Sequence, residues 1–194
     1  MYDPAPLLSL AASLGYVETP ELVAARETWQ TALGAGSPHV GDLAIAYQDL
    51  AQALDAEVHR KFDEGRTAMN YFLLSDREPS GPDQAEATAV KYATAMGFKE
   101  TPELVAQRNA VRSNPADSKA YGAYLSLADK LAAELGARFQ IGLLIAKATV
   151  YGHVGNIGYY QDDLDEAREC ARLCYFDDVV ARIGAELATF IPPT

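Results

Sequence analysis

Residues 142–161, with the sequence GLLIAKATVYGHVGNIGYYQ, hold the densest group of side chains that could bind a ligand. Glycines recur there every three residues, at 152, 155 and 158, and their missing side chains let a ligand or another backbone approach closely. Tyrosine adds an apolar ring with a polar tip, which is typical of binding surfaces. A tightly packed helix crossing would show the same pattern, so both interpretations stay open. The candidate binding residues are Tyr151, His153, Asn156, Tyr159 and Tyr160.

The histidines and cysteines do not form a metal-binding motif. His39, His59 and His153 are far apart in the sequence, and none has the spacing of HExxH. Cys170 and Cys174 are four residues apart, on one face of a predicted helix, but no second pair of ligands accompanies them. We therefore predict two reduced, unligated cysteines, no metal and no cofactor.

Several acidic residues are adjacent in the sequence, but adjacency does not produce acid–base catalysis. That chemistry needs carboxylates with a shifted pKa in a cleft. We interpret Asp162 or Asp163, and also Asp177, as caps at helix starts. The sequence contains no GxSxG, P-loop or GxGxxG motif, so we predict no catalytic residue and disfavour an enzyme.

Composition and charge restrict the partners that this chain can have. The formal net charge is -11, and residues 161–194 carry eight acidic residues against three arginines. We therefore expect no nucleic-acid binding, whereas a basic peptide or protein stays open as a partner. No charge-free run is long enough to span a bilayer. A signal peptide begins with a positively charged region, whereas no Lys or Arg occurs here before Arg26. We expect a cytoplasmic protein without membrane binding.

The elements that position these side chains are predicted to be helices, because the start and stop signals along the chain are those of helices. A capping residue followed by proline favours a helix start, and glycine favours a helix end, as at Gly15 and Gly97. Strand patterns are nearly absent. The capping residues that precede a proline are Asp3, Thr19, Ser37, Thr101 and Asn114.

Two long segments, 38–75 and 115–160, keep apolar residues in helical phase over most of their length. We interpret each as one long helix, with a hairpin near Gly136 as the open alternative in the second. The expected helices are 4–14, 20–33, 38–75, 82–96, 102–113, 115–150 or beyond, 163–174 and 177–190.

The chain contains an internal repeat. Residues 14–26 (LGYVETPELVAAR) and 96–108 (MGFKETPELVAQR) share nine of thirteen positions, at a shift of 82 residues. Residues 49–65 align more weakly with 126–142, at a shift of 77 residues. We infer a duplicated unit of short, medium and long helix within one all-α helical bundle of residues 1–194. The repeat units are about 4–78 and 82–160, followed by a helical hairpin at 162–191.

Residues 151–171 resemble one helical hairpin of the tetratricopeptide family. Tyr151, Val154-Gly155-Asn156, the DDLDEA run at 162–167 and Ala171 match the family's aromatic, Leu-Gly and alanine positions. The resemblance covers about twenty of the 194 residues. It implies an alternative fold, a short α-solenoid, and the peptide binding that such hairpins often carry out.

Two functions are consistent with these features. The first is a non-catalytic binding or regulatory protein that offers a helical groove to a protein or peptide partner. The alternative is a small-molecule-binding protein or small enzyme whose pocket is lined by the Tyr, His and Asn side chains near residues 142–161. The sequence leaves the oligomeric state open, including a homo-oligomer.

Overall fold

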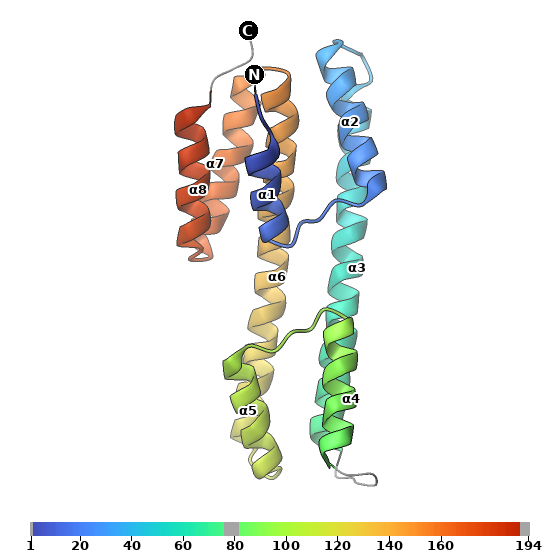
Figure 1. Cartoon of the computed structure of the whole chain (residues 1–194), viewed down its shortest axis with the longest axis vertical. Coiled ribbons are helices and arrows are strands. Elements are labelled where there is room, and N and C mark those ends of the chain that lie inside the picture. Colours follow the sequence, from blue (N-terminus) through green and yellow to red (C-terminus); the bar gives the residue numbers. More distant parts are fainter. Residues whose placement is uncertain (1, 76–81, 191–194) are drawn as a thin grey trace. The chain divides into compact units, whose positions relative to one another are not determined.

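The computed structural model describes residues 2–75 and 82–190, and within these ranges the chain is all-α, as predicted (Figure 1). No strand occurs among the described residues. None of their helices has the combination of length and apolar composition that crossing a membrane requires. The helices are α1 (Ala5–Ser13), α2 (Pro20–Gly34), α3 (Val40–Leu74), α4 (Pro82–Ala95), α5 (Pro102–Ser113), α6 (Ser118–His153), α7 (Ile157–Leu173) and α8 (Asp177–Thr189).

The two long segments are single helices, α3 and α6, which confirms the prediction from their continuous phase. The chain nevertheless divides into two compact units that each use part of both long helices. Unit 1 comprises Met1–Asp55 and Leu135–Thr194, and unit 2 comprises Ala56–Glu134. Each unit therefore contains the first part of one long helix, the second part of the other and a pair of shorter helices, α1 and α2 in unit 1 and α4 and α5 in unit 2. The expected order of short and medium helix holds in unit 1, with 9 and 15 residues, but not in unit 2, with 14 and 12. These units cross the predicted repeat boundaries because each long helix is shared.

Helices α1 and α4 end in the same way. Gly15 and Gly97 each have φ of 93°, in the left-handed region that glycine adopts without strain, which confirms their predicted capping geometry. Helices α2 and α5 also begin alike, because Thr19 and Thr101 each accept a hydrogen bond from a backbone N–H three residues later, at 3.3 Å.

We call the connection between α1 and α2, and likewise that between α4 and α5, a joint. A buried polar network fixes the joint in unit 1. The Arg26 guanidinium donates from Nε to both carboxylate oxygens of Glu18 at 3.0 Å. The Tyr47 hydroxyl donates to Glu18 Oε1 at 2.8 Å and lies 2.6 Å from the Tyr16 hydroxyl. Burial raises the pKa of both tyrosines above the ordinary value of 10.0.

Unit 2 repeats this network with one change. Arg108 Nε donates to Glu100 Oε2 at 2.9 Å, and the Tyr124 hydroxyl donates to Glu100 Oε1 at 3.3 Å. Phe98 stands where unit 1 has Tyr16, so the network of unit 2 lacks the Tyr16 hydroxyl. Arg108 also forms an ion pair with Glu86. Burial raises the pKa of Glu100 and of Tyr124 and lowers that of Arg108.

Each joint packs against a glycine of the long helix that comes from the other repeat. Tyr16 lies against Gly142, where an added Cβ would come within 2.4 Å of the tyrosine Cβ, and its ring is 5.0 Å from that of Phe139. In unit 2, Phe98 lies in the same way against Gly65 and Phe62. The two units thus make matching contacts at matching positions of the repeat. Duplication is our interpretation of this match.

The predicted starts of α6 and α7 are wrong, whereas the start of α8 at Asp177 is confirmed and only the capping role predicted for Asp177 is wrong. Helix α7 begins at Ile157, capped by Asn156, because Asp163 is needed inside the helix, where it pairs with Lys147. Helix α6 begins at Ser118, because Asp117 accepts hydrogen bonds from the two N–H groups at positions 119 and 120. Asp177 is the first residue of α8 and makes no capping bond, since Phe176 occupies the cap position. Asn114, predicted to cap α6, instead ends α5.

Candidate functional site

The predicted binding residues lie in unit 1, and Tyr160 among them is buried. Its ring stacks on that of Phe190 at 4.0 Å and meets Tyr2 edge-on at 5.9 Å. Burial raises the pKa of Tyr160 to about 12. A Cβ added at Gly152 would come within 2.6 Å of the Tyr2 ring, so this glycine permits close packing of the first and last described residues.

The other four residues divide between packing and solvent. Tyr151 is half-buried between Trp29, at 5.4 Å, and Tyr159, at 5.1 Å. The Asn156 side chain accepts the Tyr159 N–H at 3.4 Å as the cap of α7. His153 is exposed, and 59% of the Tyr159 surface is accessible. Ligand binding by this exposed pair stays a prediction.

A largely buried ion pair joins α6 to α7 near this cluster. Lys147 Nζ donates to Asp163 Oδ1 at 3.2 Å. Burial raises the pKa of the Asp163 carboxyl, and the Lys147 ammonium partly opposes that rise. The second carboxylate oxygen of Asp163 is buried without a hydrogen-bond partner among the described residues. The pair holds the two helices in register.

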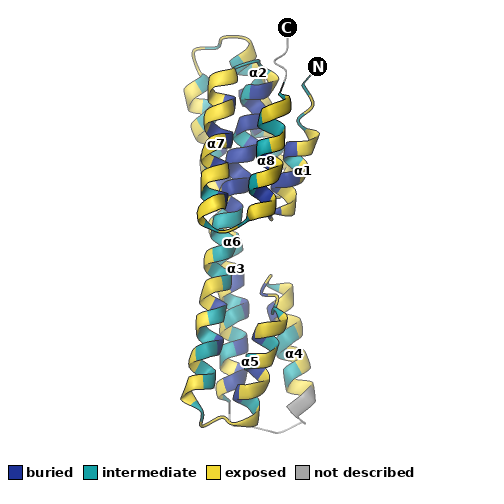
Figure 2. Cartoon of the chain, turned by 90° about the vertical axis from the view of Figure 1, so that its left-hand side faces the viewer, coloured by how far each residue is buried: buried dark blue, intermediate teal, exposed yellow. Residues whose placement is uncertain are grey.

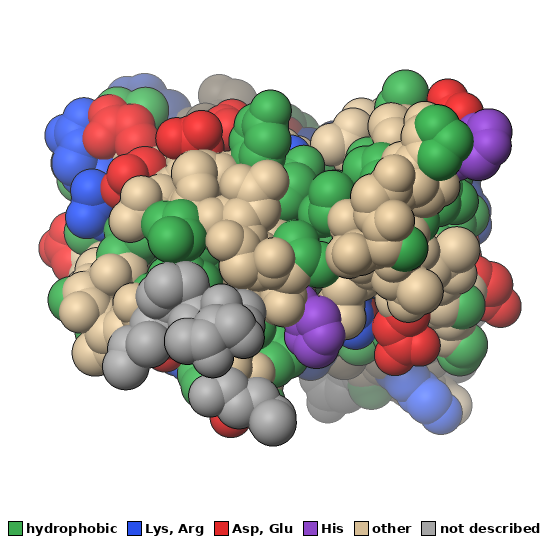
Figure 3. All heavy atoms as spheres, turned by 90° about the horizontal axis from the view of Figure 1, so that it is seen from above, with side chains coloured by type: hydrophobic (Ala, Val, Ile, Leu, Met, Phe, Trp, Pro, Cys, Tyr) green, Lys and Arg blue, Asp and Glu red, His purple; other side chains and the backbone are tan. Residues whose placement is uncertain are grey.

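The acidic residues of α7 are less available than their number suggests. Arg168 donates to Asp165 at 2.7 Å, and Arg172 donates to both carboxylate oxygens of Glu169, at 2.6 and 2.7 Å. Figure 3 shows acidic and basic side chains next to one another on the surface. An exposed, ion-paired helix face of this kind is common on soluble domains and carries no chemistry of its own.

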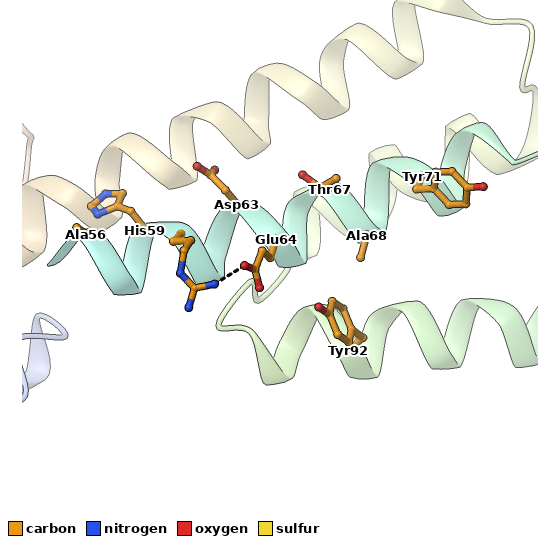
Figure 4. Close-up of a pocket in the computed structure, with 9 residues that line it drawn as sticks. Ala56, His59, Asp63, Glu64, Thr67, Ala68, Tyr71 and Tyr92 are labelled. Atoms are coloured by element: carbon orange, nitrogen blue, oxygen red, sulfur yellow. Dashed lines mark hydrogen bonds and ion pairs between the residues drawn. The ribbon is translucent and has the colours of Figure 1, made fainter. Parts of the chain in front are cut away.

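Unit 2 contains two adjoining open cavities along α3 and α4, which we call the α3–α4 groove. The larger has a volume of about 890 Å³ and the smaller about 540 Å³, and they share Ala68, Tyr71 and Tyr92. Figure 4 shows Tyr92 reaching from α4 toward the side of α3 that carries Ala68 and Glu64. The remaining lining residues are Ala56, His59, Arg60, Asp63, Glu64, Thr67, Phe72, Ser75, Gln84, Ala85, Thr88 and Ala89.

The groove exposes aromatic and aliphatic side chains. Tyr71 is 78% exposed and Tyr92 48%, and Leu74, at the end of α3 outside the lining of both cavities, is 64% exposed. Small residues such as Ala68 and Ala89 separate them, so a ridge of another helix could enter between the rings. The charged residues at the other end include the Arg60–Glu64 ion pair, drawn as a dashed line in Figure 4.

The corresponding face of unit 1 is closed. Alignment at the 77-residue shift places Glu64, Thr67, Ala68 and Tyr71 of α3 on the α6 positions 141, 144, 145 and 148. Those positions hold aliphatic residues that are at most 3% exposed, namely Ile141, Leu144, Ile145 and Ala148.

Helices α7 and α8 provide the cover in unit 1. Their inward residues belong to the same core cluster as the α6 stripe. Figures 1 and 2 both show α7 and α8 beside α1 and α6, and Figure 2 shows buried residues on their inner faces. The α7 and α8 core residues are Tyr160, Leu164, Ala167, Ala171, Val179 and Ile183. The described part of residues 56–134 contains no matching pair of helices, and the α3–α4 groove of unit 2 is open.

Sequence reasoning missed the groove, although the sequence carried a signal for it. Position by position, the repeat alignment pairs an aliphatic stripe on α6 with a polar and aromatic stripe on α3. Only the second repeat is followed by a helical hairpin. The aliphatic residues on α6 indicate a covered helix face, and the polar and aromatic residues at the matching positions of α3 indicate an exposed one.

Comparison with known proteins gives no further guide, because no family model, no curated protein and no solved structure matches this chain. Among the described residues, no group of three or more His, Cys, Asp or Glu side chains could hold a metal ion. Both cysteines are free thiols, and burial raises the pKa of Cys170.

Proposed function

We propose that this protein binds a protein or peptide partner in the α3–α4 groove of unit 2. The observation that carries the proposal is the contrast between the two units: the same face is buried under α7 and α8 in unit 1 and lies open in unit 2. An open face with several exposed apolar side chains is typical of a surface that associates with another protein.

The residues of the groove suit a protein partner better than a small molecule. Tyr71 and Tyr92 offer large rings with polar tips, the kind of side chain that dominates binding energy at interfaces. Small-molecule sites usually enclose most of their ligand, whereas these rings are 78% and 48% exposed. A partner that spans both cavities would bury both rings.

The charges of the groove do not select a strongly basic partner. Arg60 and Glu64 form an ion pair with each other, and Arg66 pairs with Asp63 at 3.2 Å and with Asp129. Both signs are therefore present and mostly paired. We expect the contact to depend mainly on burial of apolar surface, and added salt to weaken binding less than threefold.

Photo-crosslinking tests this proposal in cells that contain the natural partners. A photoreactive phenylalanine derivative would replace Tyr71 or Tyr92 in the groove, or Tyr175 in unit 1, which is 87% exposed, as the matched control. Adducts of one defined mass are expected from positions 71 and 92 and not from 175. Introducing Ala68→Arg, which fills the groove, should remove those adducts, while circular dichroism verifies that the helices remain.

Two results would contradict the proposal. One is a set of adducts that persists when Ala68→Arg fills the groove. The other is equal labelling from positions 71, 92 and 175, because it would mean that exposed aromatic positions react without selection.

A further inference from the structure

The way in which α7 lies on α6 in unit 1 indicates what kind of partner the groove receives. Helix α7 contacts α6 at two positions outside the aliphatic stripe. Lys147 forms the ion pair with Asp163 at 3.2 Å, and the Tyr151 ring lies 5.1 Å from that of Tyr159. Positions 147 and 151 are one helical turn apart, so they mark the line along which α7 lies on α6.

The α3 residues at these two positions lack such contacts. The 77-residue shift places Asn70 at the position of Lys147, and the Asn70 side-chain oxygen is buried without a hydrogen-bond partner among the described residues. It places Leu74, 64% exposed, at the position of Tyr151. A buried carbonyl oxygen without a donor is costly, and an exposed leucine next to an exposed Tyr71 adds to the uncovered apolar surface.

We infer that an amphipathic α-helix of a partner protein lies along α3 at the edge of the groove, over Thr67, Tyr71 and Leu74, as α7 lies along α6. The inference rests on the proposed function and adds the shape of the partner. The partner's apolar stripe follows the i, i+3, i+4, i+7 pattern, since that spacing matches positions 67, 71 and 74 of α3.

The occupant differs in composition from α7 itself. Where α6 has Ile141 and Ala148, α3 has the charged Glu64 and the bulky Tyr71. A helix that fits α6 would leave Glu64 against an apolar side chain and would clash with the Tyr71 ring. The α7 helix of a second copy is therefore excluded by the same comparison, and the partner carries small residues opposite Tyr71.

Selection from two displayed libraries on the intact protein tests this inference. One library presents two-helix hairpins with one randomised outer face, and the other presents unstructured peptides of the same length. We expect enriched binders from the helical library. Their affinity should fall at least tenfold with Tyr71→Ala and with Leu74→Ser, and change less than twofold with Tyr175→Ala, an exposed control position in unit 1. Thermal unfolding of each variant verifies that the fold is intact.

The remaining outcomes distinguish the inference from the proposed function. Enriched unstructured peptides that still depend on Tyr71 would overturn the helical partner and support the groove. Binders that are insensitive to Tyr71→Ala would overturn both. Sedimentation that shows a dimer broken by Tyr71→Ala would replace the foreign helix by a second copy of this chain.

Discussion

At the scale of single residues, one hydroxyl distinguishes the two buried networks. In unit 1 the Tyr16 hydroxyl extends the chain from Glu18 and Tyr47, whereas unit 2 has Phe98 at that position. The hydrogen-bonded hydroxyls of Tyr16 and Tyr47 are both in the interior, and burial raises the pKa of each above 10.0. An unfolded chain would ionise these tyrosines near pH 10, so the folded state binds more protons above that pH.

Tyr16→Phe should therefore change stability in opposite directions in two pH ranges. At pH 8 the variant loses one buried hydrogen bond and about 1 kcal/mol of unfolding free energy. Above pH 10 a tyrosine with a raised folded-state pKa loses about 1.4 kcal/mol per pH unit relative to the unfolded chain, and the variant lacks one such group. Denaturant unfolding from pH 8 to 11.5 should give a shallower decline for Tyr16→Phe than for the original protein. Parallel declines would mean that Tyr16 ionises alike in both states.

At the scale of helices, much of the fold could be predicted from local signals. Thr19 and Thr101 cap as expected, and the continuous apolar phase gave α3 and α6 as single helices. The phase identified the buried face of each long helix but not the partner of that face, since periodicity carries no long-range information. The start of α7 was missed because Asp163 has the residue type of a cap, while its role depends on Lys147, sixteen residues earlier.

The candidate site shows the same limit. The glycine and tyrosine pattern of residues 151–160 marks close packing at Gly152, which admits Tyr2 and Tyr160, but not at Gly158, where an added Cβ would meet only the Asn156 oxygen at 3.9 Å. Whether a packed segment also faces a ligand is set by neighbours that are distant in sequence. The α3–α4 groove was hidden for a related reason: the residues from Glu64 to Tyr71 look like an ordinary solvated helix face until the fate of the matching α6 face is known.

The glycines under the two joints give a test at this scale. Gly142→Ala would place a methyl group 2.4 Å from the Tyr16 Cβ, so we expect overpacking to cost about 2 kcal/mol. Gly122→Ala, in the same helix but with open space around the added Cβ, should instead stabilise the protein by about 0.5–1 kcal/mol. Chemical denaturation of both variants measures the difference. Similar effects at the two positions would show that Gly142 is not packed against the joint.

At the scale of the whole molecule, the two units share a pattern of helices and differ in cover. Each has a pair of shorter helices and parts of both long helices, with matching joints. Only unit 1 has α7 and α8, and its aliphatic stripe is buried with them in one core. The proposed function rests on this difference, because unit 2 has a polar and aromatic stripe that lines an open groove.

Removal of α7 and α8 should therefore affect the two units unequally. A chain that ends after Gly155 would expose Ile141, Leu144, Ile145 and Ala148, and each large aliphatic side chain contributes about 1.5–3 kcal/mol when buried. We expect hydrogen-exchange protection in α1 and α2 to fall at least tenfold, and the shortened chain to self-associate through the exposed stripe. Protection in α5 should persist, because the unit 2 core of Phe98, Leu104 and Tyr124 receives no residue from α7 or α8.

A single substitution, Ala167→Arg, forces the same face apart without shortening the chain and should reproduce the loss in unit 1. If the shortened chain stays monomeric with α1 still protected, then α7 and α8 do not cover unit 1 in solution, and the contrast that supports an open site in unit 2 has no basis.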